Sequence, residues 1–485
     1  MRLFLPALLF AACAFGQDIE TEIRNFTEVY ATVEREAADP VDSAKAIYGG
    51  AIPAMLRPLD PHTVFFDPDQ FEQLQKLQES VSKGFGSVVS VLPGRVIVLE
   101  TLPGTPSAKA GLSPGDEIVA INGIVLGRLT MEQLVGLLGE SHQKPATLDV
   151  RRPGSVRTLQ FVLTPEDMQT PSVERAFLLR PGVGYVHVTS FDAQTAADLK
   201  QAIEKLGGKG LKGLVLDLRG NPGGLLPSAL ETASMFLKPG QTLVAVRGRS
   251  VKATQERVPD DASPYTFPLA VLVNEKSASA AEIVAGCLQD HDRAVIVGTP
   301  SYGKGLVESV FPLSDGTGLA LTTAFYYTPS GRSIQKPLSS GQLSAPDAGP
   351  AAASQQFRTD SGKVVKGGGG IQPDYLVQDK PLTRLQMFLE ASGAFTTFAT
   401  EYLRKHPGVP ESFEVTPAVL DEFQAFLSAR NVLPGVAEWS EVRNWTVNRL
   451  KTEIFNQAFG VERGDEIEAQ RDAVILTALK ALDLG

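Results

Sequence analysis

Two short segments near the middle of the chain hold residues that could do chemistry. One runs NEKSASAAEIVAG from Asn274 to Gly286, and the other runs TPSYGKGLVES from Thr299 to Ser309. A serine hydroxyl is a poor nucleophile unless a base lies beside it, and a lysine amine can be that base where burial lowers its pKa. Serine–lysine pairs are a known variant of serine catalysis. Ser279 and Lys304 are therefore candidates for a nucleophile and its base.

A third segment, Asn221-Pro222-Gly223-Gly224, could supply hydrogen-bond donors. Its glycines let backbone approach a ligand closely, and a helix that follows would point N–H groups outward. Such donors can form an oxyanion hole. Each segment also has a plain structural interpretation. The glycine segment could be a tight turn between a strand and a helix, and the serine segment a helix cap in which Ser279 pairs with Glu282. Lys304 could be an ordinary loop lysine.

The co-occurrence of the three segments favours chemistry over these structural interpretations. Each follows an expected apolar strand, and active sites gather at the carboxyl ends of such strands. A Ser-His-Asp arrangement through His291, between Asp290 and Asp292, is the rival mechanism. His291 lies about three helical turns beyond Ser279, which separates the two along the helix axis.

The region around these segments alternates between expected strands and helices, which indicates an α/β layer. A different pattern precedes it, in which valine-rich runs alternate with glycine and proline turns around one helical stretch, Thr130 to Leu138. The fold class is thus α+β and multidomain. We expect a signal peptide (1–16), a helical N-terminal region (17–80), a small β-domain (81–166), an α/β core (167–380) with a loop or hairpin insertion (338–370), and a helical C-terminal domain (381–485).

Composition sets broad limits on the class of protein. The chain has 485 residues and a formal net charge of -10, and an acidic balance argues against a nucleic-acid partner. No metal or organic cofactor motif stands out. Cys287 lies in an apolar helical run, which is typical of a packing residue.

The first residues, MRLFLPALLFAACAFGQ, are typical of a secretory signal peptide because the apolar run is too short to span a bilayer. Small residues before Gln17 favour cleavage after Gly16. Lipidation of Cys13 and a buried N-terminal helix are the alternatives. The expected location is the periplasm, and membrane attachment depends on that lipidation.

Several separated segments resemble the C-terminal processing peptidases, also called tail-specific proteases. They occur in the family's order over residues 25–335 and again at Gly370 to Asp374; the segments are AIPAMLRPLDPHTVFF, SAKAGLSPGDEIVAING, LVLDLRGNPGGLL, SASAAEIVAGCLQDHDRAVIVG, SYGKGLVES and YYTPSGRSIQ. The resemblance implies a serine endopeptidase without a cofactor, with Ser279 as nucleophile and Lys304 as general base. It also implies oxyanion donors from Gly223 or Gly224 and from Ala280.

The chain departs from the family at Glu308, where a glutamine usually orients the lysine. A carboxylate there could still accept a hydrogen bond from the amine. An ionised one would favour the ammonium form, which cannot act as a base. Therefore either Glu308 is held neutral or the activity of the enzyme is reduced or gated.

The β-domain resembles a PDZ domain, in which Gly84-Phe85-Gly86-Ser87 matches the loop that binds a C-terminal carboxylate. The next strand would add the peptide to the sheet edge. A β-domain with a purely structural role is the alternative. We therefore expect an exported endopeptidase that recognises C-terminal tails of proteins. A silenced peptide-binding scaffold and a dimeric adaptor are the competing hypotheses.

Overall fold

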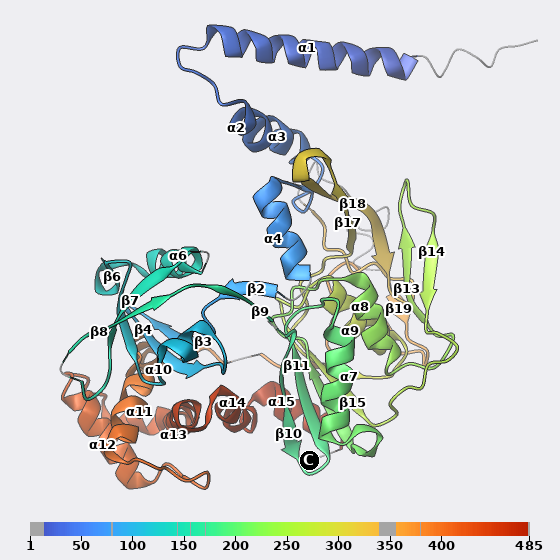
Figure 1. Cartoon of the computed structure of the whole chain (residues 1–485). Helices are drawn as coiled ribbons and strands as arrows, with labels where there is room; N and C mark the ends of the chain where they lie inside the picture. The colour runs from blue at the N-terminus through green and yellow to red at the C-terminus, as the bar shows by residue number, and fades with distance from the viewer. Residues whose placement is uncertain are drawn as a thin grey trace, which may run out of the picture. The chain divides into compact units, whose positions relative to one another are not determined.

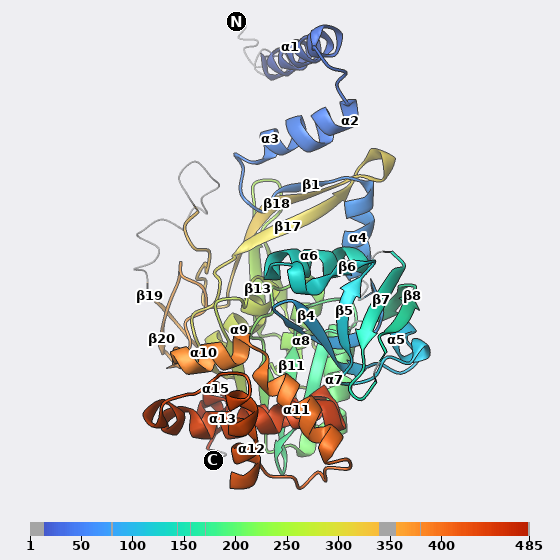
Figure 2. The same cartoon turned by 90° about the vertical axis from the view of Figure 1, so that its left-hand side faces the viewer.

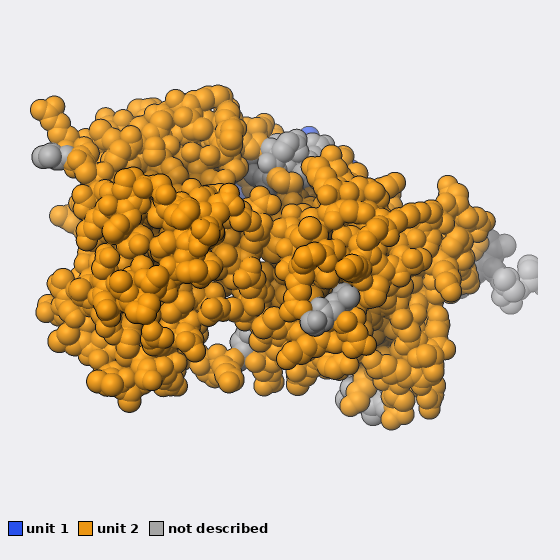
Figure 3. All heavy atoms as spheres, turned by 90° about the horizontal axis from the view of Figure 1, so that it is seen from below, with its two compact units in different colours: residues 1–71, 308–322, 338–343 blue, residues 72–307, 323–337, 344–485 orange. Residues whose placement is uncertain are grey.

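The computed structural model of the chain describes residues 14–78, 81–142, 144–155, 157–169, 171–338, 356–378 and 380–483. Its residues form two compact units, coloured separately in Figure 3: residues 1–71, 308–322 and 338–343 make the first, and the rest make the second. The expected α+β class is confirmed, with helical regions at both ends, a small β-domain and an α/β core (Figure 1). None of the helices in the described residues combines the length and apolar character needed to cross a membrane.

The first unit is helical at its start and ends in strands. It contains α1 (Ala14–Glu36), α2 (Ser43–Ala46), a π-helical turn (Ile47–Ala51), α3 (Ile52–Leu56) and β1 (Val64–Phe66). Strand β1 pairs antiparallel with the first residues of β18 (Gly318–Tyr327), and β17 (Leu306–Pro312) pairs with β18. Before β1, Asp60 accepts hydrogen bonds from the backbone of His62 and Thr63, which fixes a turn there.

The small β-domain is a sheet with one main helix. Its strands run in the order β3-β4-β5-β7-β8, with β6 paired to β5, and a short helix α5 (Pro106–Ala110) follows β4. The bounds are β3 (Ser87–Leu92), β4 (Arg95–Thr101), β5 (Glu117–Ile121), β6 (Ile124–Val125), β7 (Ala146–Arg151) and β8 (Leu159–Leu163). Helix α6 (Met131–Ser141) begins at a capping box between Thr130 and Gln133.

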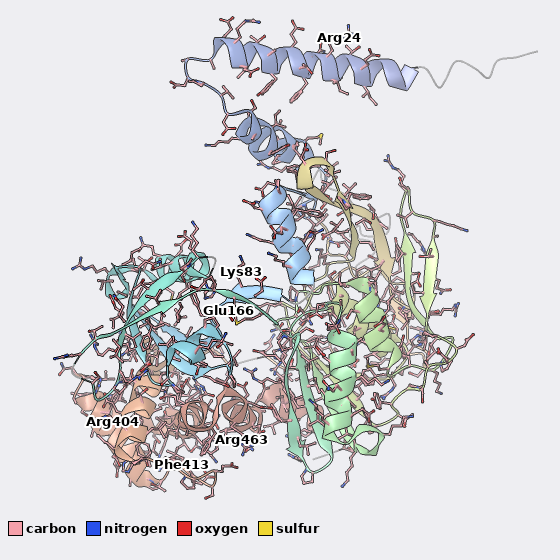
Figure 4. The ribbon with its side chains drawn as sticks, viewed as in Figure 1. Arg24, Lys83, Glu166, Arg404, Phe413 and Arg463 are labelled. Atoms are coloured by element: carbon pink, nitrogen blue, oxygen red, sulfur yellow. The ribbon has the colours of Figure 1, made fainter. Side chains whose placement is uncertain are left out.

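Two strands flank the β-domain in sequence and pair with each other. They are β2 (Val81–Gly84) and β9 (Glu166–Gln169), and their antiparallel register places Lys83 opposite Asp167 and Gly84 opposite Glu166. Lys83 and Glu166 are labelled in Figure 4. The chain segments that lead into and out of the β-domain are therefore paired with each other.

The core is a six-stranded sheet in the order β10-β11-β12-β15-β16-β21. Only β10 is antiparallel to its neighbour; the others run parallel. The bounds are β10 (Val173–Arg180), β11 (Val183–Val188), β12 (Gly213–Asp217), β15 (Leu269–Val273), β16 (Val295–Gly298) and β21 (Tyr375–Leu376). Their nearly continuous apolar runs fit strands buried on both faces.

Helices cover both faces of this sheet. Residues of α7 (Thr195–Leu206), α8 (Leu226–Ser234) and α9 (Ala280–Asp290) share one apolar cluster with Leu214 and Leu216 of β12. On the other face, Val215 packs with Val474 and Ile475 of α15 (Ala473–Ala481). The last described helix of the chain thus completes the core.

Smaller strands lie beside the core. Strands β13 (Thr242–Arg247) and β14 (Thr254–Arg257) form a hairpin, and β13 also pairs with the last residues of β18. The insertion expected at 338–370 forms a hairpin of β19 (Gln356–Arg358) and β20 (Val364–Lys366); its residues 339–355 lie outside the described ones. Helix α4 (Pro68–Gln78) joins the two units in sequence.

The C-terminal helices form a domain of their own around stacked aromatic rings. They are α10 (Arg384–Ala391), α11 (Ala394–Lys405), α12 (Pro417–Ser428), α13 (Val436–Phe459) and α14 (Val461–Ala469) (Figure 2). Phe395, Phe398 and Phe423 are almost fully buried at its centre. The helical spacing of these aromatics in the sequence therefore marks a packed core.

This helical domain is attached to the rest of the second unit in two places. Arg95 and Glu100 of the β-domain hydrogen-bond to Thr397 and Val461. At the core, Asp465 of α14 pairs with Arg175 of β10, and Asp472, which caps α15, lies 2.8 Å from Arg219. The same helices therefore contact both the β-domain and the sheet.

Candidate active site

The three segments singled out in the sequence follow neighbouring parallel strands. Strand β12 leads into the glycine turn at 221–224, β15 into Ser279, and β16 into the lysine loop. These strands are adjacent in the order β12-β15-β16, so their carboxyl ends meet at one edge of the sheet. That edge is where ligands bind in open α/β sheets.

Ser279 occupies a strained position between β15 and α9. Its φ is 53° and its ψ is -114°, whereas the other described non-glycine residues with positive φ are Asn or Asp, which tolerate that region. Such strain costs about 1–3 kcal/mol and persists where the surroundings impose it. Ser279 is also the cap residue of α9, so the structural and the chemical interpretations apply to the same residue.

The glycine turn lies directly against this serine. A Cβ added at Gly223 would stand 2.8 Å from the Ser279 Cβ and 3.0 Å from the Ala280 nitrogen, and the φ of Gly223 is +104°. The Asn221 carbonyl accepts from the Ala278 N–H at 2.9 Å, which ties the two segments together. A glycine is therefore required here both for space and for backbone conformation.

The oxyanion donors expected from the family differ in availability. Ala280 is the first residue of α9, and its N–H has no acceptor within the helix. The Gly223 N–H, in contrast, donates to Asn221 Oδ1 at 2.8 Å. Gly224 forms an isolated bridge with Phe191, whose carbonyl lies where a Gly224 Cβ would be.

Glu282 joins the serine segment to the lysine loop. Its Oε2 accepts from the N–H groups of Ser279 and Lys304, both at 2.9 Å. Its Oε1 accepts from the Ser301 hydroxyl at 2.5 Å and the Gly303 N–H at 2.7 Å. One buried carboxylate thus receives four donors from two segments.

The environment of Glu282 has opposing effects on its ionisation. Burial raises the pKa of the Glu282 carboxyl, while the hydrogen bonds from Ser301, Lys304, Gly303 and Ser279 act in the other direction. The side chain is 0% exposed. Because all four contacts place a donor against an oxygen, the side chain acts there as an acceptor.

Tyr326 contacts the backbone carbonyls of Ser279 and Lys304. Its hydroxyl donates to the Lys304 carbonyl at 2.5 Å and lies 3.2 Å from the Ser279 carbonyl. Burial raises the pKa of Tyr326, so its hydroxyl stays protonated and able to donate. Ser279 and Lys304 are thus tied to each other at their N–H groups by Glu282 and at their carbonyls by Tyr326.

Glu308 lies on β17 and belongs to the first unit. There its Oε1 is 3.9 Å from His62 Nδ1, and both side chains are mostly buried. His62 follows Asp60 in the segment LDPHT that the family resemblance includes. The sequence does not suggest this neighbour for Glu308, because the two residues are far apart along the chain.

The rival histidine lies at the opposite end of α9. His291 follows the last residue of that helix, about 18 Å along the axis from Ser279 at 1.5 Å per residue. Its Nδ1 is 2.7 Å from Asp360 Oδ2, and its Nε2 is 2.7 Å from the Thr242 carbonyl. The structure therefore separates His291 from the serine. Cys287, as expected, is a fully buried packing residue, and burial raises the pKa of its thiol.

The loop expected to receive a carboxylate connects β2 to β3. The Phe85 carbonyl accepts from the Ser107 N–H, and the Gly86 carbonyl accepts from the Leu102 N–H, both at 2.8 Å. In a trans peptide the N–H points opposite to the carbonyl, so the N–H groups of Gly86 and Ser87 point away from these contacts. Strand β3 is the edge of its sheet among the described strands, and Gly84 ends β2.

Sequence reasoning missed part of this arrangement. It considered Glu282 only as a helix cap, and it gave no role to Tyr326 or Ser301. One signal was present: a glutamate inside the apolar run of α9 needs partners if that helix is buried. The hydroxyl of Tyr326 carries no comparable signal in the sequence.

Comparisons with known proteins identify relatives of this chain. The family model described as peptidase family S41 matches residues 182–341, and a PDZ domain model matches residues 97–152. A carboxy-terminal-processing protease of Bartonella bacilliformis is 35% identical over 326 residues, which cover 66% of this chain and 74% of the relative. A carboxyl-terminal-processing protease of Synechocystis is 36% identical over 293 residues, 59% of this chain and 68% of the relative.

Among solved structures, the chain is similar to a photosystem II D1 C-terminal processing protease. The sequence identity is 29%, the TM-score is 0.39, and the match covers 74% of this chain and 93% of that one.

Proposed function

Because this chain belongs to peptidase family S41, as a carboxy-terminal processing protease and hence a serine peptidase, we propose that Ser279 is its nucleophile and Lys304 its general base. The neutral Lys304 amine takes the proton of the Ser279 hydroxyl as Oγ attacks the carbonyl carbon of the scissile peptide bond. The resulting ammonium then gives that proton to the leaving amine, which leaves an acyl-enzyme. Water, activated by the amine, hydrolyses the ester and restores both residues.

The link through Glu282 is the observation that carries this proposal. A single carboxylate oxygen accepts from the backbone N–H of both Ser279 and Lys304. The two residues come from different loops, so their shared partner fixes them relative to each other. Pre-organisation of this kind lowers the cost of reaching the transition state.

The oxyanion hole is proposed to use the Ala280 N–H together with that of Gly223 or Gly224. Ala280 follows the nucleophile directly, and Gly223 lies against it. The Gly223 N–H can join the hole once it exchanges Asn221 Oδ1 for the oxyanion. The Gly224 N–H is the alternative second donor.

The role of Glu308 distinguishes the peptidase hypothesis from the scaffold hypothesis. In the proposed enzyme it orients the lysine amine, as the family glutamine does. In the competing hypothesis its charge silences the dyad, and the protein only binds peptides. His62 Nδ1 lies 3.9 Å from this carboxylate.

Cleavage of an unfolded protein that ends in apolar residues tests the dyad. We expect the wild type to cleave it, Ser279→Ala and Lys304→Ala to be inactive, and Lys276→Ala to be unaffected, because Lys276 is an exposed lysine of the same region. Wild-type cleavage no greater than that of the two dyad variants refutes the peptidase mechanism. Substrate binding without cleavage by all four proteins supports the scaffold instead. Inhibition by EDTA would point to another mechanism.

The β-domain is proposed to bind the C-terminal tail of the substrate. The outward N–H groups of Gly86 and Ser87 would receive the carboxylate, and the open edge of β3 would pair with the peptide. The test changes the peptide and not the protein, because a substitution at Gly86 would place a Cβ 2.2 Å from the Thr105 side chain. A free C-terminal acid should bind at least about tenfold more tightly than its carboxamide, since one charge-assisted hydrogen bond contributes about 1.5 kcal/mol. Equal affinity for the two peptides refutes carboxylate recognition.

We also propose that the protein is exported and cleaved after Gly16. Residues 1–13, with Cys13, lie outside the described ones. The intact mass of the mature protein decides between a start at Gln17 and a lipidated Cys13. A mass that retains the first 16 residues without a lipid contradicts both.

A further inference from the structure

The peptide unit that precedes the Lys304 Cα is held at both of its ends. Its carbonyl, from Gly303, accepts from the Lys336 N–H at 3.0 Å. Its N–H, from Lys304, donates to Glu282 Oε2 at 2.9 Å. Because a peptide unit is planar, partners at both ends fix the orientation of the whole unit.

The peptide unit that follows the Lys304 Cα is held in the same way. Its carbonyl accepts from the Tyr326 hydroxyl at 2.5 Å, and its N–H, from Gly305, donates to Gln335 Oε1 at 2.7 Å. With the planes on both sides of the Cα fixed, the φ and ψ of Lys304 are fixed. These two angles set the direction in which the lysine side chain leaves the backbone.

The Gln335 amide fits its place at both ends. Its Nε2 donates to the Lys336 carbonyl at 2.8 Å, while its Oε1 accepts from Gly305. An amide has one accepting oxygen and one donating nitrogen, so these two partners admit a single orientation of the side chain. The residue is only 3% exposed. The accepting oxygen is therefore held toward the lysine loop.

The segment that carries Gln335 lies directly against the lysine loop. A Cβ added at Gly305 would stand 3.0 Å from the Gln335 nitrogen, and a Cβ added at Gly303 would stand 2.6 Å from Lys336 Cγ. Glycine is the residue that permits such a close approach. The glycine on each side of Lys304 is therefore explained by the contact with residues 335 and 336.

This segment is anchored by parts of the core other than the lysine loop. The Ser333 carbonyl accepts from the Gly368 N–H at 2.7 Å, and the Ile334 carbonyl accepts from the Gly370 N–H at 3.0 Å. Ile334 is fully buried in the main apolar cluster of the core. Gln335 is thus held in place by its own surroundings and can fix the loop that it contacts.

We propose that Gln335 is a positioning residue for Lys304. It acts on the lysine backbone through the Gly305 N–H, and so differs from the position of Glu308, where the family glutamine orients the amine. The inference rests on the proposed role of Lys304 as general base. Without the Gln335 oxygen the peptide unit after Lys304 is held at one end only, and the amine is no longer aimed at Ser279.

Cleavage of an unfolded protein by Gln335→Met tests the proposal. Methionine has a similar length but leaves the Gly305 N–H without an acceptor. A shift of about 1 Å in a catalytic group can cost about 100-fold, so we expect kcat to fall by about 10- to 100-fold. KM should stay within about twofold of the wild type, because a buried side chain does not touch the substrate.

Gln335→Glu separates positioning from folding. The carboxylate keeps an oxygen for the Gly305 N–H, but its second oxygen faces the Lys336 carbonyl, where the amide donated. The variant should therefore lose Tm, as Gln335→Met does, and yet retain a higher kcat than Gln335→Met. Equal kcat in the two variants overturns the proposal, because the accepting oxygen is then not what matters.

Gln457 supplies a matched control from the C-terminal helices. Its amide is also bonded at both ends, since it accepts from the Thr400 hydroxyl at 2.9 Å and donates to the Thr396 carbonyl at 3.0 Å. Gln457→Met should lower Tm and leave kcat within about twofold of the wild type. If Gln335→Met does not fold, Gln335→Asn replaces it: its shorter side chain does not reach the Gly305 N–H, and it should show the same loss of kcat.

The results distinguish failure of this inference from failure of the proposed mechanism. If Lys304→Ala cleaves at the wild-type rate, the lysine is not the base, and both fail together. If Lys304→Ala is inactive while Gln335→Met keeps the wild-type kcat, the positioning role alone is overturned. A higher KM at unchanged kcat in Gln335→Met overturns it as well.

Discussion

Replacement of Glu282 by glutamine should damage the site more than any change of similar size on the surface. The carboxylate accepts four hydrogen bonds, two at each oxygen. An amide keeps one accepting oxygen and turns the other into a donating NH2 group. The Ser301 hydroxyl can turn to accept from that NH2 group, so with the nitrogen on the Ser301 side the Gly303 N–H alone faces a donor inside the protein.

The magnitude follows from that lost contact. A buried donor without an acceptor costs about 1–3 kcal/mol, so Glu282→Gln should destabilise the fold by about that amount. If only about 2 kcal/mol of this falls on the transition state, kcat/KM drops about 30-fold. The loss should appear in kcat, because Glu282 acts through the backbone of Ser279 and Lys304 and is fully buried.

Two further variants make the measurement decisive. Glu275→Gln changes an exposed glutamate just before the serine segment, and it should leave both Tm and kcat/KM near wild-type values. Ser301→Ala removes one donor from Glu282 and the acceptor of the Ile371 N–H, so it should also lower Tm, but it should lower kcat/KM less than Glu282→Gln does. Thermal unfolding and cleavage of an unfolded substrate provide the two readouts. The reasoning is refuted if Glu282→Gln folds with wild-type Tm and kcat, or if its only effect is a higher KM.

Three other changes are expected to have measurable effects. Glu308→Gln should keep or raise the cleavage rate near neutral pH, because it restores the family residue; a loss of more than about tenfold would show that the carboxylate itself takes part. Asp472→Ala should lower the free energy of unfolding by about 2 kcal/mol in urea, since it removes the α15 cap and the partner of Arg219, whereas Asp472→Asn should cost less than half of that. Burial alone would lower the pKa of His187, but Glu174 and other nearby acceptors raise it overall. The protonated imidazole therefore stabilises the fold below about pH 6.5, and this stabilisation is lost as pH rises through the folded pKa. The Tm difference between wild type and His187→Gln should shrink from pH 6 to pH 8.5. A Tm difference that stays constant over this range contradicts the prediction.

Local patterns in the sequence predicted the elements around Ser279 and Lys304 well. The apolar strands before the serine, lysine and glycine segments occur where their runs predict them, because strands buried on both faces leave a continuous apolar signal. The valine-rich runs of the β-domain likewise form strands. Strands β17 and β18 were not anticipated, since residues on them alternate less regularly and their pairing partners are distant in sequence.

The contacts of the site depended on tertiary structure and could not be predicted in the same way. Glu282 has a local signature as a helix cap, and that signature was recognised. Its bonds to Ser301, Gly303 and Lys304 connect loops about 20 residues away, so no pattern within a short window encodes them. The hydrogen bond from the Gly223 N–H to Asn221 Oδ1 likewise depends on a side-chain orientation that sequence spacing does not specify.

The position of α15 has a consequence for the order of events during synthesis. Val474, Ile475, Ala478 and Leu479 close one face of the central sheet, so this face stays bare until residues 473–481 have been made. The serine and lysine segments leave the ribosome much earlier. The strands that carry them therefore reach their final packing only after residues 473–481 have been made.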